Sequence, residues 1–367
     1  MTKLIYAAVL SVVSFFSLAQ PRYIDSLGRL AAKEKSDTSK AKFYYRISSA
    51  YVDMGNGDSA MRYALLSKQL SSKTNFLKGL AVSCNFLGQI KNYTGFQDSA
   101  IYYFEASKHY YDQLGDTSRA AGLLNNLGIV YRQQGNYGKA LTCYFQSLKT
   151  KEHFKDSIGI ANSYHNIAQA YGESGDTVNS IKYHRLALDI RRKVGDLSGV
   201  GASLVPIALY HKHNKNYTAA VTNLEEALKI AEQLQEEESI AIATYNLGGV
   251  YYEQGQLERA MAHFERSLAI SKKNENVMGV AVCMESIAMI FRDKKDLKSA
   301  VNYLEEAYNL SRRAGAVDVI GGISEKLAEM YEATGDTKRA LQFFKIYRNL
   351  HDSLFNEENI RKLTSEN

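Results

Sequence analysis

The stretch AGLLNNLGIVYRQQGNYGKALTCY, residues 121–144, decides the fold. Leu127 and Tyr131 are four residues apart, so they fall on one face of a predicted helix. Gly135 interrupts that helix, because glycine readily takes the left-handed conformation that closes a helix end. Tyr144 then belongs to the apolar face of a second helix. The stretch therefore predicts two helices joined by a tight turn.

The same pattern returns every 40 residues with no insertion, which makes this chain an array of internal repeats. Each repeat has a large aliphatic residue, a small residue directly after it and, in most repeats, an aromatic residue three positions later. The small residues are Ser48, Gly88, Gly128, Ala168, Ala208, Gly248, Ala288 and Ala328. One helix pair cannot bury its own apolar face, so neighbouring pairs must stack on each other.

The motif L-x-x-L-G-x-x-Y at residues 124–131, followed by A-x-x-x-Y at residues 140–144, resembles the tetratricopeptide repeat (TPR). The resemblance covers residues 41–350 and implies an all-α fold, a right-handed α-solenoid of about eight helix-turn-helix repeats. The period of 40 exceeds the usual period of about 34. The six additional residues correspond to about one and a half helical turns, so the repeat resembles the long-helix subgroup that binds peptides or partner domains.

The two ends of the chain show different patterns. Residues 1–19 resemble a secretory signal peptide, with Lys3 before an apolar run and small residues near Ala19. The apolar run is shorter than the ~20 residues of a membrane span, although an uncleaved anchor is the alternative. A signal peptide would direct export of the protein to the periplasm or cell envelope. Residues 20–40 are expected to form a capping helix, and residues 351–367 a C-terminal helix or tail.

Several classes of function find no support in the sequence. The net charge is +6, but basic and acidic residues are mixed, which argues against a nucleic-acid surface. The phosphate-loop, nucleophile-elbow, zinc-protease and dinucleotide motifs do not occur, so we expect no enzyme and no cofactor. His211 and His213 would point to different faces of a helix, so we expect no metal site. No other stretch is apolar enough to predict a membrane span.

The resemblance also implies where a ligand would bind. In TPR proteins the first helix of each pair lines the concave face. The corresponding residues here are Asn85, Gln89, Asn125, Asn126, Arg132, His165, Asn166, Gln169, Tyr245, Asn246 and Arg292. An asparagine amide both donates and accepts hydrogen bonds, which suits the backbone of an extended peptide. Arginine can hold a carboxylate through two parallel hydrogen bonds. The alternative is a polar helix face that only contacts water.

Two functions remain open at this point. The first is an exported TPR scaffold that binds a peptide or protein in its concave groove as a sensory or signalling module. The array resembles the exported sensor region of bacterial TPR-containing sensor kinases or regulators, so a separate kinase or regulator is the expected partner. The second is a structural or assembly scaffold of the cell envelope with no dedicated peptide groove.

Overall fold

The computed structural model describes the backbone of residues 21–365, and the side chains of residues 21–352 except that of residue 318. The predicted signal peptide lies outside the described residues. The chain divides into two compact units, which are considered separately: unit 1 ends at Asn166 and unit 2 begins at Ile167.

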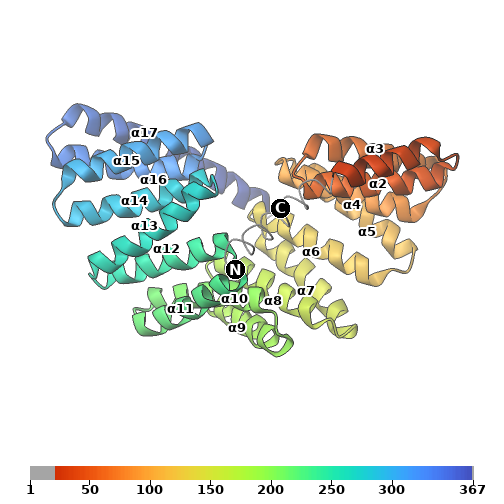
Figure 1. The fold of residues 1–367 in the computed structure, drawn as a ribbon, viewed down its shortest axis with the longest axis horizontal. Coiled ribbons are helices and arrows are strands. Elements are labelled where there is room, and N and C mark those ends of the chain that lie inside the picture. Colours follow the sequence, from red (N-terminus) through yellow and green to blue (C-terminus); the bar gives the residue numbers. More distant parts are fainter. Residues whose placement is uncertain (1–20, 366–367) are drawn as a thin grey trace, which may run out of the picture. The chain divides into compact units, whose positions relative to one another are not determined.

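All the regular structure in the described residues is helical, which confirms the predicted α-solenoid of TPR-like pairs (Figure 1). Residues 21–33 form an unpaired helix before the first pair. The first helices of the pairs are α2 (Asp37–Asp53), α4 (Leu77–Tyr93), α6 (Thr117–Gln133), α8 (Ser157–Glu173), α10 (Leu197–His213), α12 (Glu237–Glu253), α14 (Val277–Asp293) and α16 (Val317–Ala333). The second helices are α3 (Gly57–Lys73), α5 (Gln97–Gln113), α7 (Tyr137–His153), α9 (Thr177–Val194), α11 (Tyr217–Leu234), α13 (Leu257–Lys273), α15 (Leu297–Ala314) and α17 (Thr337–Ser365).

The helices pack in chain order inside each unit. From α2 to α7 in unit 1, and from α9 to α17 in unit 2, consecutive helices contact each other. The last helix, α17, continues without a break through residues 351–365, where the sequence predicts a separate helix or tail. Within the described part of the chain, no helix is long and apolar enough to cross a membrane.

Helices end at a turn that recurs at a constant interval along the chain. From Gly55 to Gly335, every twentieth residue has a positive φ. Glycine takes this conformation at little cost, but Lys155 and Lys215 also adopt it, at 54° and 58°. The residue after the turn closes it in the usual way: Asn136 N–H donates to the Tyr131 carbonyl at 2.8 Å. The turns between repeats therefore match the turns inside them.

Many helix starts are capped by the side chain of the residue directly after the turn. The Asp116 and Asn136 side chains accept hydrogen bonds from the backbone N–H groups three residues further on, both at 3.1 Å. Such a cap satisfies a backbone donor that has no partner inside the helix. Where the cap is present, the turn and the cap together fix where one helix ends and the next begins.

In three pairs a close contact joins a glycine of the first helix to an aromatic residue of the second. The glycine cases are Gly88 with Phe104, Gly128 with Tyr144, and Gly248 with Phe264. A Cβ atom at Gly128 would lie only 2.5 Å from the Tyr144 ring. Where the small residue of an interior pair is alanine, the equivalent position of the second helix holds neither phenylalanine nor tyrosine. These cases are Ala168 with His184, Ala208 with Leu224, and Ala288 with Leu304. A smaller residue on one helix thus accommodates a larger one on the other.

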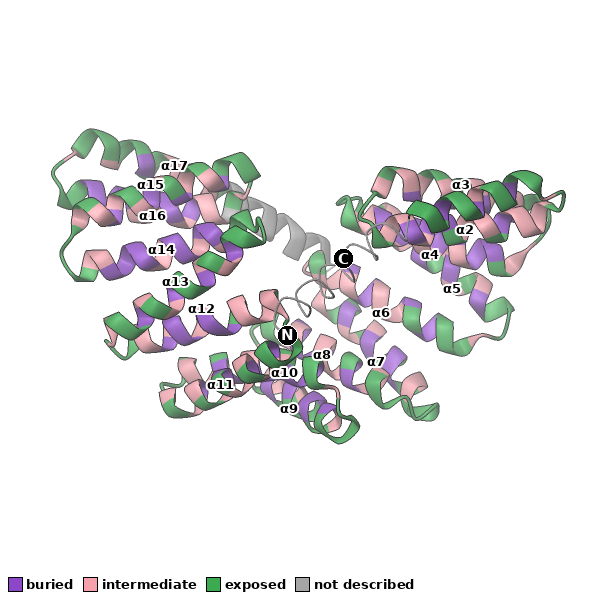
Figure 2. Cartoon of the chain, viewed as in Figure 1, coloured by how far each residue is buried: buried purple, intermediate pink, exposed green. Residues whose placement is uncertain are grey.

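The next pair in the array covers this contact. Phe264 is 3% exposed and packs with Ile287 and Ile290 of α14 in the following pair. Phe344 occupies the same repeat position in the last described pair and is 50% exposed. Figure 2 shows the general distribution of burial, with buried residues along the helices and exposed residues gathered at the turns. Burial at this position therefore comes from stacking.

In five pairs, stacked aromatic rings form a second contact between the two helices. One ring from each helix takes part, with centroids 5.3–5.7 Å apart and planes within 23° of parallel. The pairs are Tyr51–Tyr63, Tyr171–Tyr183, Tyr251–His263, Phe291–Tyr303 and Tyr331–Phe343.

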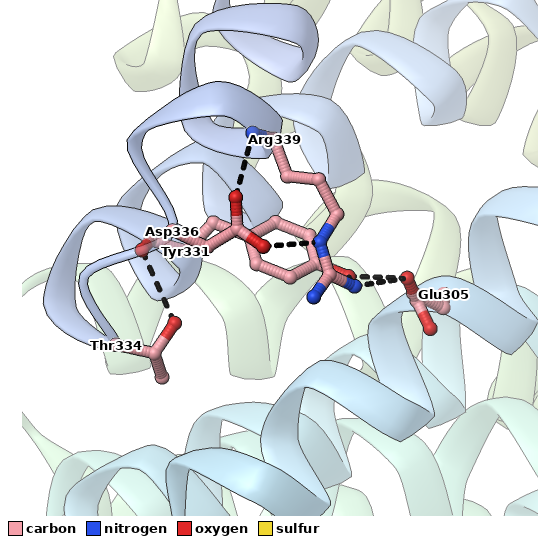
Figure 3. A network of polar contacts seen from close by, with 5 residues as sticks. All are labelled: Glu305, Tyr331, Thr334, Asp336 and Arg339. Atoms are coloured by element: carbon pink, nitrogen blue, oxygen red, sulfur yellow. Dashed lines mark hydrogen bonds and ion pairs between the residues drawn. The ribbon is translucent and has the colours of Figure 1, made fainter.

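A polar network joins the last three helices around one of these rings (Figure 3). The Tyr331 hydroxyl donates to Glu305 of α15, and Arg339 of α17 donates to that hydroxyl at 3.0 Å. Arg339 also bonds Asp336 at 2.6 Å and lies 4.3 Å from the Tyr331 ring centroid. Burial, then the bond to Glu305, raises the pKa of Tyr331 to about 12. The stabilisation by the neutral phenol is therefore complete below the ordinary tyrosine pKa and is lost as the pH rises through about 12.

Replacing Gly128 by alanine is expected to lower the free energy of unfolding by about 1–3 kcal/mol, because the new methyl group would meet the buried Tyr144 ring. Adding Tyr144→Leu to Gly128→Ala should relieve the clash, since Ala208 and Leu224 already form that combination. Urea unfolding followed by circular dichroism measures both effects.

Gly138→Ala is the matched control. Gly138 lies in a helix and is exposed. A Cβ atom at Gly138 would have no neighbouring atom within 4 Å. Alanine there should be neutral or stabilising by up to ~1 kcal/mol. Equal behaviour of the Gly128 and Gly138 variants would contradict the close-contact account.

Candidate functional site

The predicted binding residues all lie on first helices, but in both units. Unit 1 contains Asn85 and Gln89 on α4, Asn125, Asn126 and Arg132 on α6, and His165 and Asn166 on α8. Unit 2 contains Gln169 on α8, Tyr245 and Asn246 on α12, and Arg292 on α14. Two local sites, one in each unit, can therefore be described from these residues.

Many of these polar side chains contact each other between neighbouring repeats. In unit 1, Asn166 donates to Asn125 at 2.7 Å, and Asn126 donates to Asn85 at 3.4 Å. The two partners are 41 positions apart in the chain, so each contact reaches one position beyond the equivalent residue of the next repeat. We call this series of contacts the polar ladder.

The polar ladder continues in unit 2 with other residue types at the same spacing. The contacts are Tyr245 with Ser286 at 3.2 Å, Lys326 with Glu285 at 2.9 Å, Lys212 with Glu253 at 3.2 Å, and Tyr252 with Asp293 at 2.5 Å. Arg292 also participates, bonding Asp293 at 2.9 Å and the Tyr252 hydroxyl at 3.1 Å. The predicted carboxylate-binding role of Arg292 therefore competes with a carboxylate of the protein itself.

The contacts between asparagines leave some of their amide donors and acceptors unused. An asparagine side chain has two N–H donors and an oxygen with two lone pairs. The bond from Asn126 to Asn85 uses one donor of the first and one lone pair of the second. Both side chains are only partly buried, so their remaining groups can meet a ligand.

A cavity of about 480 Å³ opens beside these amides in unit 1. Three predicted residues, Asn85, Asn125 and Asn126, line it. The other lining residues are Tyr111, Arg119, Gly122, Leu123, Lys151 and Asn162. Two of the lining residues are cationic and none is a carboxylate.

Lys151 and Arg119 differ in their surroundings. Lys151 lies near the end of α7 and donates to the Ser163 hydroxyl at 2.9 Å. Burial lowers the pKa of Lys151, and the nearby charge of Asp156 opposes this effect. Arg119 is more exposed, pairs with Asp116 and lies 5.8 Å from the Tyr111 ring centroid.

A second cavity, of about 420 Å³, lies among α12, α13 and α14 of unit 2. Tyr245 and Asn246 line it together with apolar side chains that include Ile242, Met278 and Val282. Burial raises the pKa of Tyr245, so its hydroxyl is neutral at ordinary pH. This cavity therefore suits an apolar group that reaches a few polar atoms.

Part of the unit 1 site was not predicted from the sequence. Tyr111 and Lys151 belong to second helices, and Arg119 lies at the start of α6 rather than in its middle. A signal was present, because Lys151 stands where other repeats have Ser71, Ser271 or Ser311. The described residues contain no cluster of three or more metal-ligand side chains.

Comparison with protein families matches the tetratricopeptide repeat model at residues 118–193, 200–273 and 240–313, which together span more than half of the chain. A comparison with curated protein sequences found no match.

Three solved structures illustrate the similarity of fold. The apo form of the quorum sensor NprR from B. thuringiensis is 14% identical with a TM-score of 0.71, covering 94% of this chain and 96% of that one. A Rap protein complexed with Competence and Sporulation Factor is 15% identical with a TM-score of 0.60, covering 93% and 99%. Aspartyl phosphate phosphatase F from Bacillus subtilis is 12% identical with a TM-score of 0.65, covering 92% of each chain.

Replacing Asn125 and Asn166 by alanine, singly and together, tests whether the polar ladder holds repeats together. We expect a coupling of about 0.5–1.5 kcal/mol in the free energy of unfolding, as for a hydrogen bond between neutral groups. The longer Asn85–Asn126 contact should give a smaller coupling in a parallel cycle. Strictly additive losses in the first cycle would show that the Asn125–Asn166 contact does not couple the two repeats.

Proposed function

The chain belongs to the tetratricopeptide repeat family, and we propose that it is a non-enzymatic scaffold that holds a peptide or a segment of a partner protein. The segment would bind along the polar face of the first helices, beside Asn85, Asn125 and Asn126. This face combines amide donors and acceptors with an adjoining cavity.

The unit 1 cavity is the observation that carries this proposal. Its asparagine amides keep donors and acceptors that the polar ladder does not use, and an extended peptide backbone presents the complementary groups. The cavity volume of about 480 Å³ is sufficient for one or two side chains of a bound segment.

A signalling role is part of the proposal. One structural neighbour was solved with Competence and Sporulation Factor bound, and another is a quorum sensor. These relatives share the fold at 14–15% identity, so they support a sensory scaffold by analogy only. A third is named a phosphatase, whereas the cavities described here suggest binding rather than catalysis. We further propose export through the leader at residues 1–19 and a separate kinase or regulator as the partner.

The polar ladder favours a second candidate function, a structural or assembly scaffold of the cell envelope. Side chains such as Arg292 already bond neighbouring repeats, as they would if this face served only to stiffen the array. The two candidates differ in whether Asn125 and Asn126 matter for holding a partner.

Capture of partners from a native envelope extract by the immobilised protein separates the two candidates. Asn125→Ala with Asn126→Ala should reduce the recovery of specific partners at least tenfold, measured by quantitative mass spectrometry. The control is Asn302→Ala with Asn309→Ala, which changes two exposed asparagines of the second helix α15. Unchanged recovery by a folded Asn125/Asn126 variant would favour the structural scaffold.

A further inference from the structure

We propose that the unit 1 cavity binds an oxyanion, a carboxylate or phosphate group of the partner peptide, with Lys151 as its main cation. The inference rests on the proposed function, because it names the chemical group by which the partner is held there. Lys151 is on a second helix, so the binding surface extends beyond the first helices.

The charge of the cavity is the first argument. Lys151 and Arg119 contribute two positive charges, and no carboxylate lines the cavity. The remaining polar lining consists mainly of asparagine amides, which can donate to an oxyanion without adding charge. Hydrogen bonds from cations and amides to an oxyanion are shorter and stronger than those between neutral groups.

Arg191 occupies the equivalent position of the next repeat, and there the protein itself provides partners for the cation. Arg191 donates to the Gly199 carbonyl at 2.9 Å and to the Ser203 hydroxyl at 2.8 Å. It also lies 3.5 Å from the Asp196 carboxylate. The protein itself therefore supplies both hydrogen bonds and a countercharge to Arg191.

Lys151 has fewer hydrogen-bond partners in the protein than Arg191 has. Its ammonium group has three N–H donors, and the structure gives it one hydrogen bond, to Ser163. Among the described residues no carboxylate forms an ion pair with Lys151. Asp156 and its counterpart Asp196 both cap a helix, by accepting from Gly159 N–H at 2.9 Å and Gly199 N–H at 3.0 Å, but only Asp196 also pairs with the cation of its repeat. Two donors of Lys151 thus remain for a group that enters the cavity.

Burial makes this arrangement costly without a ligand. The pKa of Lys151 is lowered because its charged form is partly removed from water. An oxyanion beside the ammonium group would offset that cost. Arg119, at the more exposed rim, already pairs with Asp116 and would contribute less.

Titration calorimetry of the full chain at low ionic strength tests the proposal, with inorganic phosphate and succinate as separate probes. We expect one anion bound per chain, at least tenfold weaker binding in Lys151→Met, and a smaller loss in Arg119→Gln. Lys149→Met is the matched control, because Lys149 is exposed on the same helix and does not line the cavity. Its affinity should stay within twofold of the unmodified protein.

The two probes separate the sources of the oxyanion. Binding of phosphate alone supports a phosphorylated segment, binding of succinate alone supports an acidic side chain or chain end, and binding of both supports a site open to either. Binding of neither, or binding that Lys151→Met leaves unchanged, overturns the proposal. Lys151→Met removes a partly buried charge, so we expect it to fold, and circular dichroism checks this. If neither anion binds while the Asn125/Asn126 variant still loses its partner, the scaffold function stands and only the oxyanion pocket is wrong.

Discussion

Each helix pair of this protein has an apolar face that it cannot cover alone, and the structure depends on the next pair covering it. The same repeat position is almost fully buried at Phe264 and half exposed at Phe344, where the described array ends. Inside several pairs, close approach of the two helices requires a small residue opposite a large one, as with Gly128 and Tyr144. Stability is therefore a sum of local contacts between neighbours rather than the property of one central core.

This constraint also produces the candidate site. Because the turns recur at a constant interval, the first helices stay equal in length and polar residues of successive first helices come into register. Asn125 thereby lies beside Asn166 of the next repeat and also beside the unit 1 cavity. The same packing brings Lys151 of a second helix to that cavity. A ligand there would contact groups that the array has already placed for structural reasons.

Much of the fold could be predicted from the sequence, because its determinants recur in one register. The small residue and, in most repeats, the aromatic residue and the glycine equivalent to Gly135 appear once per repeat and identify the helix pairs. The left-handed backbone at Lys155 and Gln235 was not predicted, since neither residue is glycine, although both have positive φ.

The candidate site was predicted less completely, for physical reasons. Asn125 and Asn126 were identified because first helices line the binding face in similar proteins. Their partners in the polar ladder were not, because comparing repeats aligns equivalent positions, whereas each contact joins a residue to the position after its equivalent. Lys151 was missed because its approach to the cavity depends on how a second helix packs against α8.

Removing one whole repeat tests the central claim most directly. Deletion of residues 237–276 takes out α12 and α13 and would bring Lys212 opposite Asp293 in place of Glu253, preserving the ion pair. The account predicts that this chain keeps its helical content per residue and its cooperative unfolding in urea, whereas deletion of residues 257–276, one helix, loses both. Equal losses from the two deletions would contradict nearest-neighbour stacking.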